Sequence, residues 1–292
     1  MPHVKIRQNS KSITHAVYYH QLGITGKNIT IAILDSGLYL HEDFNKNRIL
    51  DFYDTVHYKR YPYDDCSHGT HVAGIIQSSK IGIAPQANLI PIKILDENGD
   101  GSVSNFIEGI QWILEHIDIY HIRIVNISIG GNTLELNQEQ NTLNDWVQKL
   151  WDKGVIVCCS AGNNGPNPNS VTTPGTCKDV ITVGSYDGKN FSSSGAIRPY
   201  ITKPEIMAPG MHILSTKPQK GYQIKNGTSM SVPFISGSIA LLLQLNENLT
   251  NEDVKLHLMN CARPIHYMPY YMQGAGAFNL SAFLSDFLYE QY

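Results

Sequence analysis

The sequence predicts a single α/β domain with three layers, in which a mainly parallel sheet lies between helices. Short runs of β-branched residues alternate with amphipathic stretches of helix length, which is typical of repeated strand-helix-strand units. With 292 residues the chain can bury a sizeable core and still fit one large domain. Hydrophobic residues make up 42% and charged residues 16%, which excludes an extensively disordered chain.

Five segments predict the strands of this sheet. Each is a short run of aliphatic and β-branched residues with few charges, as expected of strands that helices cover on both faces. Gly, Pro and Asn clusters follow several of them, and such loops at the carboxyl ends of parallel strands are where open α/β folds build sites. The predicted strands are residues 28–34, 87–95, 123–129, 154–160 and 179–185.

Apolar residues at helical spacing predict two helices between the strands. Residues 104–117 bring Phe106, Ile110 and Ile113 to one face, and residues 143–151 repeat the pattern. These stripes are interpreted as core. Beyond Leu245 two further helices are expected at the packed end of the domain. We expect a short N-terminal extension, residues 1–22, packed on a domain formed by residues 23–292.

Charge and cysteine content restrict the partners and the compartment. The net charge of −3 and the scattered basic residues predict no binding of nucleic acid, and the basic-aromatic segment 57–63 is interpreted as a solvated loop. The N-terminus lacks a secretory signal and no run is expected to be long enough to span a membrane. Five cysteines, an odd number, favour a reducing compartment. We therefore expect a cytoplasmic chain with no membrane partner.

Two isolated residues occupy positions that suit catalysis. Asp35 directly follows an apolar strand, which aims its carboxylate at the edge of the sheet where sites form. His68 lies among Ser, Gly and Thr, just before small apolar residues. Taken singly, Asp35 is more often a turn residue at the end of a strand, and His68 is more often a residue of a helix start or of the core. A function for the pair requires a nucleophile.

Residues 226–246 supply candidates for that nucleophile. Gly, Thr and Ser precede an apolar run, so a serine here stands at a helix start, where backbone N–H groups favour a developing negative charge. Pro233 is compatible with a first helical turn. The local pattern does not separate Ser229 from Ser231, and either is also a legitimate helix cap.

Three blocks of sequence resemble the signature motifs of the subtilisin-like serine proteases. They are DSG at Asp35, HGTHVAG from His68 and GTSMSVP from Gly227, in the order Asp, His, Ser known for that family. Four further blocks resemble its substrate-pocket segment, its oxyanion segment, its strand-end turn and its C-terminal signature. These blocks are residues 126–131, 160–165, 207–210 and 274–279.

The resemblance implies a serine endopeptidase of subtilisin-like α/β fold, acting through an acyl-enzyme. Ser229 would attack the peptide carbonyl, His68 would accept the proton and deliver it to the leaving amine, and Asp35 would orient the imidazole. The side chain of Asn163, with the backbone N–H of Ser229, would hold the oxyanion. No cofactor and no metal is implied for this chemistry.

The resemblance also implies a peptide or protein substrate bound as an extended strand between two segments of the chain. No acidic residue falls in the expected pocket for the side chain before the cut, so an uncharged residue is predicted there. The residues implied in substrate binding are Gly99, Gly101, Val103, Ser128, Ile129, Gly130, Gly131, Ala161, Gly162 and Thr172.

Two departures from the family pattern bear on the role of the protein. The family pattern begins almost at Met1, with no signal or propeptide, and the loop 75–80 is too short for the calcium loop of many relatives. Both features suit cytoplasmic members, which include general intracellular subtilisins and peptidases that cut the leader from a modified peptide precursor. The short N-terminus favours a leader-processing enzyme. Cys66 is the cysteine nearest the expected site, where a packing role is the commoner one.

Two other functions are weighed against the protease. His68 and His71 have the i, i+3 spacing of a zinc site, but the Glu of a zinc-hydrolase helix and a third ligand are missing nearby. The second alternative is a catalytically inactive homologue that binds a peptide or a partner. Retention of all three triad positions and of Asn163 argues against loss of activity.

Overall fold

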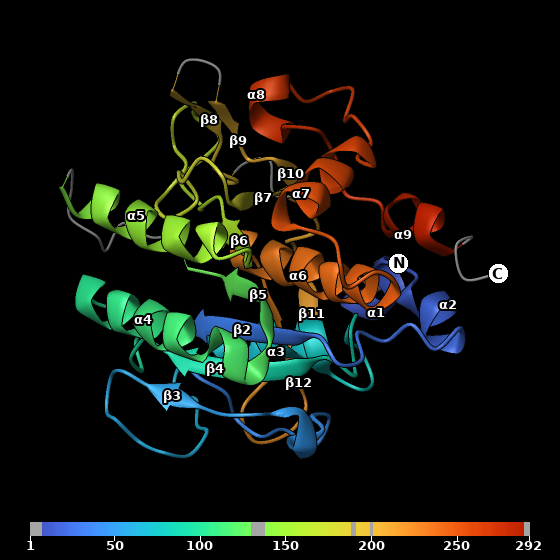
Figure 1. Ribbon diagram of the computed structural model, residues 1–292. Coiled ribbons are helices and arrows are strands. Elements are labelled where there is room, and N and C mark those ends of the chain that lie inside the picture. The colour runs from blue at the N-terminus through green and yellow to red at the C-terminus, as the bar shows by residue number, and fades with distance from the viewer. Residues whose placement is uncertain (1–7, 130–137, 188–190, 199–200, 289–292) are drawn as a thin grey trace, which may run out of the picture.

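A parallel sheet of seven strands forms the centre of the part of the chain that the computed structural model describes, which is residues 8–129, 138–187, 191–198 and 201–288 (Figure 1). The strand order is β10-β7-β6-β5-β2-β4-β3, and each neighbouring pair is parallel. The strands are β2 (Thr30–Asp35), β3 (Tyr53–Asp54), β4 (Asn88–Lys93), β5 (Ile122–Ile127), β6 (Ile156–Ser160), β7 (Ile181–Ser185) and β10 (Ile206–Ala208).

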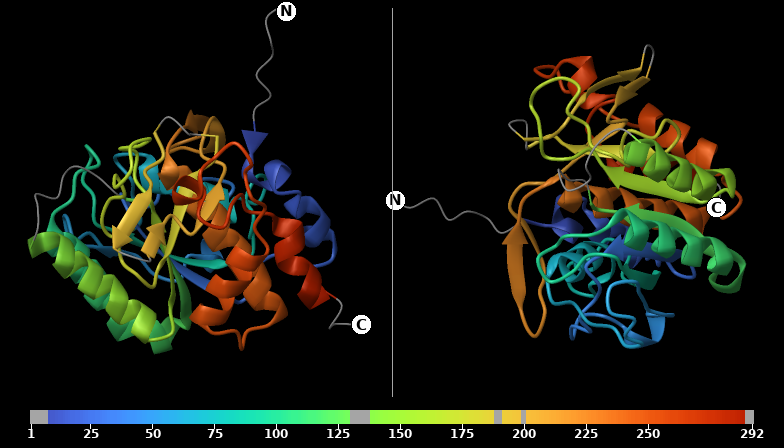
Figure 2. Two further views of the ribbon diagram at one scale, coloured as in Figure 1. Left: turned by 90° about the horizontal axis from the view of Figure 1, so that it is seen from above. Right: turned by 90° about the vertical axis from the view of Figure 1, so that its left-hand side faces the viewer.

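Helices cover both faces of the sheet and produce the three layers seen in Figures 1 and 2. One layer contains α3 (His68–Gln77) and α6 (Thr228–Leu245), which pack on each other and on β2. The other contains α4 (Val103–Tyr120) and α5 (Gln138–Asp152), which also contact each other. The predicted three-layer α/β fold with a mainly parallel sheet is confirmed.

The remaining elements lie around this sandwich. The N-terminal α1 and α2 precede the sheet, and α7, α8 and α9 follow α6, so three helices stand where two were expected beyond Leu245. A small sheet pairs β11 with β1 and β12, and β8 pairs with β9. Their bounds are β1 (Gln8–Asn9), α1 (Ser10–Ile13), α2 (Ala16–Gln21), η1 (Lys46–Arg48), β8 (Gly195–Arg198), β9 (Ile201–Lys203), β11 (Ile213–Thr216), β12 (Tyr222–Lys225), α7 (Asn251–Asn260), α8 (Tyr270–Gln273) and α9 (Leu280–Leu288).

Apolar burial explains why these sequences form the central strands. All six residues of β2 are buried, and Ile31 and Leu34 are fully inaccessible to solvent. Removing a side chain of this size from water stabilises the folded chain by roughly 1.5–3 kcal/mol. The five predicted strands correspond to β2, β4, β5, β6 and β7. The short outer strands have fewer apolar residues and gave no comparable pattern.

Helix α6 differs from two expectations drawn from the sequence. It is 18 residues long and apolar enough to cross a membrane by length and composition, so the prediction of no such run was wrong. Serines in its first turns had hidden its apolar character, and 83% of it is buried within the domain, where it packs on the sheet and beside α3. Pro233 is the sixth residue of the helix, and so lies beyond the first turn where it was expected.

The chain changes direction across the sheet between β2 and β5. From β2 it continues through α3 to β4 on one side, whereas from β5 it continues through α5 to β6 on the other. In open α/β sheets a crevice forms at such a point, beyond the carboxyl ends of the strands. Asp35 is the last residue of β2 and Ser128 follows β5, so the fold brings both to this crevice.

The N-terminal helices pack on the layer that contains α3 and α6. The hydroxyl of Ser10 donates to the carbonyl oxygen of Ile81 at 2.5 Å, and Tyr19 is only 4% exposed. Strand β1 adds to β11 through Gln8 and Asn9. Residues 8–21 are thereby tied to the end of α3 and to β11.

Candidate active site

The site is built around a direct contact between Asp35 and His68. Asp35 ends β2, His68 begins α3, and Nδ1 of His68 lies 2.7 Å from Oδ1 of Asp35. The carboxylate is 1% exposed, whereas the imidazole is 23% exposed. The buried carboxylate fixes the proton on Nδ1, which leaves Nε2 as the basic nitrogen.

Close backbone packing brings the start of α3 to the end of β2. A Cβ atom at Gly69 would overlap the carbonyl oxygen of Gly37, so this approach requires glycine. The N–H of Gly69 donates to Oγ of Ser36 at 2.9 Å, and that hydroxyl donates to Oδ1 of Asp64 at 2.9 Å. Ser36, which follows Asp35, and Gly69, which follows His68, are therefore joined by a direct hydrogen bond.

A buried lysine holds the loop after β2 from the other side. Lys93 is fully buried, and its Nζ donates to the carbonyl oxygens of Ser36 and Leu95 at 2.8 and 2.7 Å. It also forms an ion pair with Asp65 at 2.6 Å. A buried charge that is paired and fully hydrogen-bonded is costly to disturb, so this network fixes the backbone on which Asp35 stands.

The electrostatics around His68 favour its protonated form. Burial disfavours the charged imidazole, but the charge of Asp35 and the hydrogen bond to it outweigh burial and raise the pKa of His68 above its ordinary value of 6.5. The nearby charge of Lys225 acts in the opposite direction. The base is thus strengthened by its carboxylate partner.

The structure separates the two candidate serines of the α6 start. The hydroxyl of Ser231 is fully buried and donates to the carbonyl oxygen of Ala208 at 3.2 Å. Ser229 is partly exposed and lines the same pocket as His68. Gly227, which precedes the helix, has φ = 143°, a backbone conformation that favours glycine and that turns the chain sharply into α6. Of the two candidate serines, Ser229 is the one that lines the pocket.

Asn163 lies against the turn that carries Ser229. Its Oδ1 accepts hydrogen bonds from the backbone N–H and the hydroxyl of Thr228, at 3.0 and 3.2 Å. Because Thr228 engages the oxygen, the amide Nδ2 remains as the donor that the side chain turns toward Gly227. An amide donor next to a helix N-terminus suits a developing anion.

The pocket that contains His68 and Ser229 has a volume of about 280 Å³. Ile94, Leu95 and Phe106 contribute apolar wall next to β4 and α4. The N–H of Cys66 and that of Ser67 both donate to Oδ1 of Asp64, which fixes the turn leading to His68. The lining residues are Cys66, His68, Ile94, Leu95, Asn98, Gly99, Gly101, Ser102, Phe106, Ser128, Ile129, Thr173, Lys225 and Ser229.

Four of the predicted substrate-binding residues line this pocket, namely Gly99, Gly101, Ser128 and Ile129. The hydroxyl of Ser128 accepts a hydrogen bond from the buried amide of Asn126 at 2.8 Å. The carbonyl oxygen of Ile129 accepts one from the hydroxyl of the last residue of β6 at 2.8 Å. This segment after β5 is consequently held in place by β5 and β6.

The other predicted residues lie elsewhere. Val103 is the first residue of α4, where it continues a helix instead of an extended segment. Ala161 is fully buried and accepts a hydrogen bond from the N–H of Thr172 at 3.0 Å, while Gly162 packs beside Thr172. The neighbour Thr173 lines the pocket in place of Thr172. Gly130 and Gly131 fall outside the described residues.

Several pocket residues were not identified from the sequence. Phe106 was assigned to the core, and it is 3% exposed, yet it also lines the pocket. Lys225 belongs to the small sheet of β11 and β12, which the sequence did not predict, and it meets the start of α3 only through the fold. The sequence offered one indication that Lys225 lies near the site, which is its position four residues before Ser229.

The geometry of the second histidine does not support a zinc pair with His68. His71 is fully buried, and its Nε2 lies 3.1 Å from the carbonyl oxygen of Ile213 in β11. Burial and the charges of His68 and Lys225 lower the pKa of His71 to about 3. The two imidazoles therefore contact different partners. Within the described ranges no group of three or more His, Cys, Asp or Glu side chains is arranged to hold a metal.

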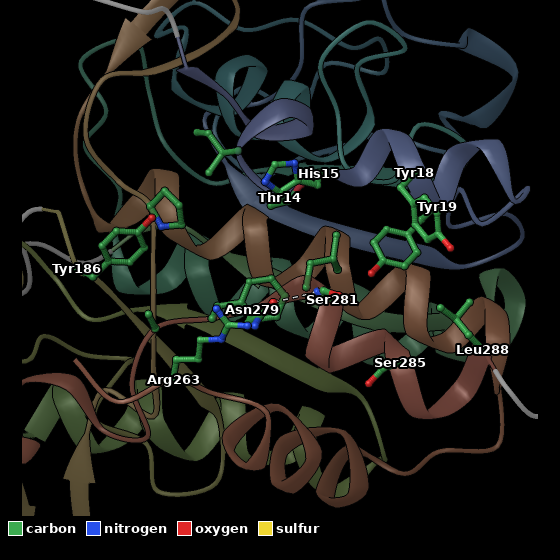
Figure 3. Close-up of a pocket in the computed structure, with 15 residues that line it drawn as sticks. Thr14, His15, Tyr18, Tyr19, Tyr186, Arg263, Asn279, Ser281, Ser285 and Leu288 are labelled. Atoms are coloured by element: carbon green, nitrogen blue, oxygen red, sulfur yellow. Dashed lines mark hydrogen bonds between the residues drawn. The ribbon is translucent and has the colours of Figure 1, made fainter. Parts of the chain in front are cut away.

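A larger cavity, of about 750 Å³, lies away from these residues, between the N-terminal helices and α9 (Figure 3). Tyr18 and Tyr19 line it on one side, and Arg263 and Asn279 on another. It contains no residue of the Asp35, His68 and Ser229 set. Size does not identify the active site here, because the smaller pocket holds the chemically complementary groups.

Comparison with known proteins assigns the chain to a class. Residues 26–279 match the sequence profile of the subtilase family, which covers most of the chain. The chain therefore belongs to the subtilase family and carries a subtilisin-like serine endopeptidase domain.

Particular relatives agree with this assignment. The chain is 37% identical to serine protease AprX of Bacillus subtilis over 88% of its length and 66% of that protein, and it spans 67% of subtilisin E of the same organism at 34% identity. It is 34% identical to subtilisin of Bacillus pumilus over 90% of its length and 93% of the relative. A crystal structure of a cold adapted subtilisin-like serine proteinase superposes with a TM-score of 0.72 at 29% identity, covering 87% of this chain and 88% of the other.

Proposed function

We propose that the protein is a serine endopeptidase that cuts peptide bonds through Asp35, His68 and Ser229. The observation that carries the proposal is the 2.7 Å contact between Asp35 and His68, next to a pocket that His68 shares with the partly exposed Ser229. A serine hydroxyl is a weak nucleophile until a base of suitable pKa accepts its proton. The pair supplies such a base in the pocket that Ser229 also lines.

In the proposed reaction, Oγ of Ser229 attacks the substrate carbonyl while Nε2 of His68 takes the hydroxyl proton. The imidazolium that forms is stabilised by the buried carboxylate of Asp35, which stays ionised throughout. His68 then gives the proton to the leaving amine, and the acyl-enzyme remains on Ser229. Water releases the acyl group by the same steps, with His68 again acting as base and then as acid.

The negative charge of the tetrahedral intermediate requires fixed donors. We assign them to Nδ2 of Asn163 and to the backbone N–H of Ser229 at the start of α6. The contact of Oδ1 with Thr228 supports the assignment of Asn163, because it engages the oxygen and leaves Nδ2 as the donor near Gly227. Donors fixed in advance need no reorganisation at the moment of reaction.

The substrate is proposed to be a peptide or protein segment that binds as an extended strand. Gly99 and Gly101 on one side and Ser128 and Ile129 on the other support this mode, since they line the pocket from two separate loops. Ile94, Leu95 and Phe106 make part of the wall apolar. We propose that the residue before the cut is uncharged.

A cleavage profile of the purified protein on a mixed peptide library tests this function. We expect cuts within peptides, with uncharged residues before the cut, and no cuts by the Ser229→Ala variant. An absence of cleavage by the wild-type protein would favour an inactive homologue that only binds peptides. Dominant cleavage after Arg would contradict the proposed pocket while leaving the endopeptidase activity in place.

For the biological role we propose a dedicated processing protease that acts on a peptide precursor in the cytoplasm. All five cysteines are free, and Cys158 and Cys159 are buried side by side in β6, which supports a reducing compartment. The test is the breadth of the same cleavage profile, together with fractionation of the source cells. Broad, unselective cleavage or recovery of the protein outside the cells would contradict this role.

A further inference from the structure

The pocket contains one lysine side chain that the proposed reaction does not use. Lys225, at the end of β12, is the one Lys, Arg, Asp or Glu among the described residues that line the pocket. Its Nζ donates to the hydroxyl of Ser67 at 3.2 Å. Over the described ranges it takes part in none of the ion pairs.

The carboxylates around the start of α3 are already engaged by other groups. Asp35 binds His68, and Asp65 binds Nζ of Lys93. Asp64 accepts hydrogen bonds from Ser36, Cys66, Ser67 and Thr70 through its two oxygens. The ammonium of Lys225 is thus left with a neutral hydroxyl as its partner, and its charge faces the pocket without compensation.

Lys225 lies on the side of the pocket where we expect the substrate residues after the cut to bind. It contacts Ser67, the residue directly before His68, and the neighbouring Gln223 donates to the carbonyl oxygen of Ser67 at 3.4 Å. In the proposed reaction His68 delivers its proton to the leaving amine, so substrate residues after the cut pass beside His68. Gly99 and Ser128 lie in loops at the edge of the central sheet. These loops are separate from β12, which carries Lys225.

We propose that Lys225 selects substrates that carry Asp or Glu directly after the scissile bond. A substrate carboxylate there would form a charge-assisted hydrogen bond with Nζ of Lys225, which lies in a partly buried position. This inference rests on the proposed endopeptidase function and names the class of substrate for the same site. An ammonium without a carboxylate partner in the free protein gains that partner only from a correct substrate, which is the basis of selectivity.

The test compares peptides that differ only in the residue after the cut, which is Glu, Gln, Asp, Asn or Lys. For the wild-type protein we expect kcat/KM for Glu to exceed that for Gln by about five- to thirtyfold, the range between an exposed and a well-formed charged hydrogen bond. Lys225→Gln should reduce this ratio to near one, and Lys225→Glu should favour the Lys peptide. The ratio should also fall as salt is added.

Lys220→Gln is the matched control, because Lys220 lies on the same hairpin, in the turn at the other end of β12, and does not line the pocket. It should keep the wild-type ratio. An equal kcat/KM for Glu and Gln in the wild-type protein, or an unchanged ratio in Lys225→Gln, overturns the inference. A preference for Asp or Glu that is confined to a position before the cut would also overturn the inference.

Binding to the Ser229→Ala protein provides a readout that needs no turnover. The dissociation constants of the Glu and Gln peptides, measured by fluorescence anisotropy, should differ in the same direction, and Lys225→Gln in that background should remove the difference. Equal binding overturns the selectivity of Lys225. Absence of cleavage with selective binding overturns the proposed function alone, so the two failures are distinguishable.

Discussion

The side of the pocket formed by Asp35 and His68 is held far more firmly than the side formed by Lys225. Asp35 is almost completely buried and binds both His68 and the N–H of Ser36, and partly buried hydrogen bonds to Asp64 fix the turn before His68. Lys225 is partly exposed and makes one side-chain hydrogen bond, to Ser67. We therefore expect reactivity to depend on the buried geometry of Asp35 and His68, and selectivity to depend on the charge of Lys225. Substitutions on the first side should slow every substrate, and those on the second should change their ranking.

The largest effect is expected from Asp35→Asn. The amide keeps the size of the side chain but no longer stabilises the imidazolium, and it favours the wrong tautomer of His68. We expect kcat to fall about 10⁴-fold for all peptides, the order of magnitude seen for the matching aspartate of subtilisin. Steady-state kinetics check this, with Asp152→Asn, an exposed carboxylate on α5, as the control. A fall in kcat that differed from peptide to peptide would mean that Asp35 also affects selectivity, against the contrast drawn with Lys225.

The next largest effect is expected from Asn163→Ala. Without the amide donor the oxyanion is held by the backbone N–H of Ser229 alone. We expect kcat to fall about 10²–10³-fold, the value known for the matching residue of subtilisin, with little change in KM. Asn167→Ala, in the same loop, should keep the wild-type kcat. A rise in KM at constant kcat would show that Asn163 binds the substrate and does not stabilise the intermediate.

The pH profile of kcat/KM should reflect the raised pKa of His68. The base is active only when neutral, so activity is lost as the pH falls through this pKa, about tenfold per pH unit. Because Asp35 raises the pKa, the midpoint should lie above the ordinary value of 6.5. Lys225→Gln should move the midpoint further up, since the charge of Lys225 lowers the pKa of His68. A midpoint below 6.5 would contradict the electrostatic account.

His71, one turn further along α3, should affect stability and not chemistry. Its pKa is lowered to about 3 in the folded chain, so between pH 6.5 and about 3 the unfolded chain binds more protons. The neutral imidazole therefore contributes stability above pH 6.5 that is lost as the pH falls, by about 1.4 kcal/mol per pH unit. Urea unfolding across this range should show a shallower pH dependence for His71→Gln. Equal slopes would count against the buried neutral form.

The smallest effect is expected at Cys66, which lines the pocket beside Gly99. Burial raises the pKa of the Cys66 thiol, so little thiolate is present near neutral pH. Iodoacetamide should slow catalysis gradually, and faster as the pH rises. Cys66→Ser should abolish this sensitivity, with Cys261→Ser as the control. Equal inactivation of the Cys66→Ser protein would mean that another thiol controls the pocket.

The sequence predicted the centre of the fold because burial leaves a strong pattern there. The five predicted strands are continuous apolar runs, and helix α4 has a regular apolar stripe. Strands β11 and β12 were not predicted because they lie outside the central seven-stranded sheet and mix polar with apolar residues. The membrane-length apolar run of α6 was missed because serines interrupt its first turns.

A site residue could be predicted only where it stands in a recognisable sequence motif. Asp35 and His68 stand in distinctive motifs, so their meeting was foreseeable from the resemblance. Lys225 contacts Ser67, which is 158 residues away in the chain, and no local pattern reports such a contact. Thr173 lines the pocket, and the role of its neighbour Thr172 in substrate binding stays a prediction.

Active-site labelling with a fluorophosphonate tests whether Asp35 and His68 activate Ser229, because the reagent reacts only with a serine that an assembled base activates. The wild-type protein should be labelled, and peptide mass spectrometry should find the label on Ser229. Labelling should persist in Ser231→Ala, whose hydroxyl is buried against Ala208, and should be absent from Ser229→Ala. A label on another residue, or none on the folded wild-type protein, would contradict the account of this site.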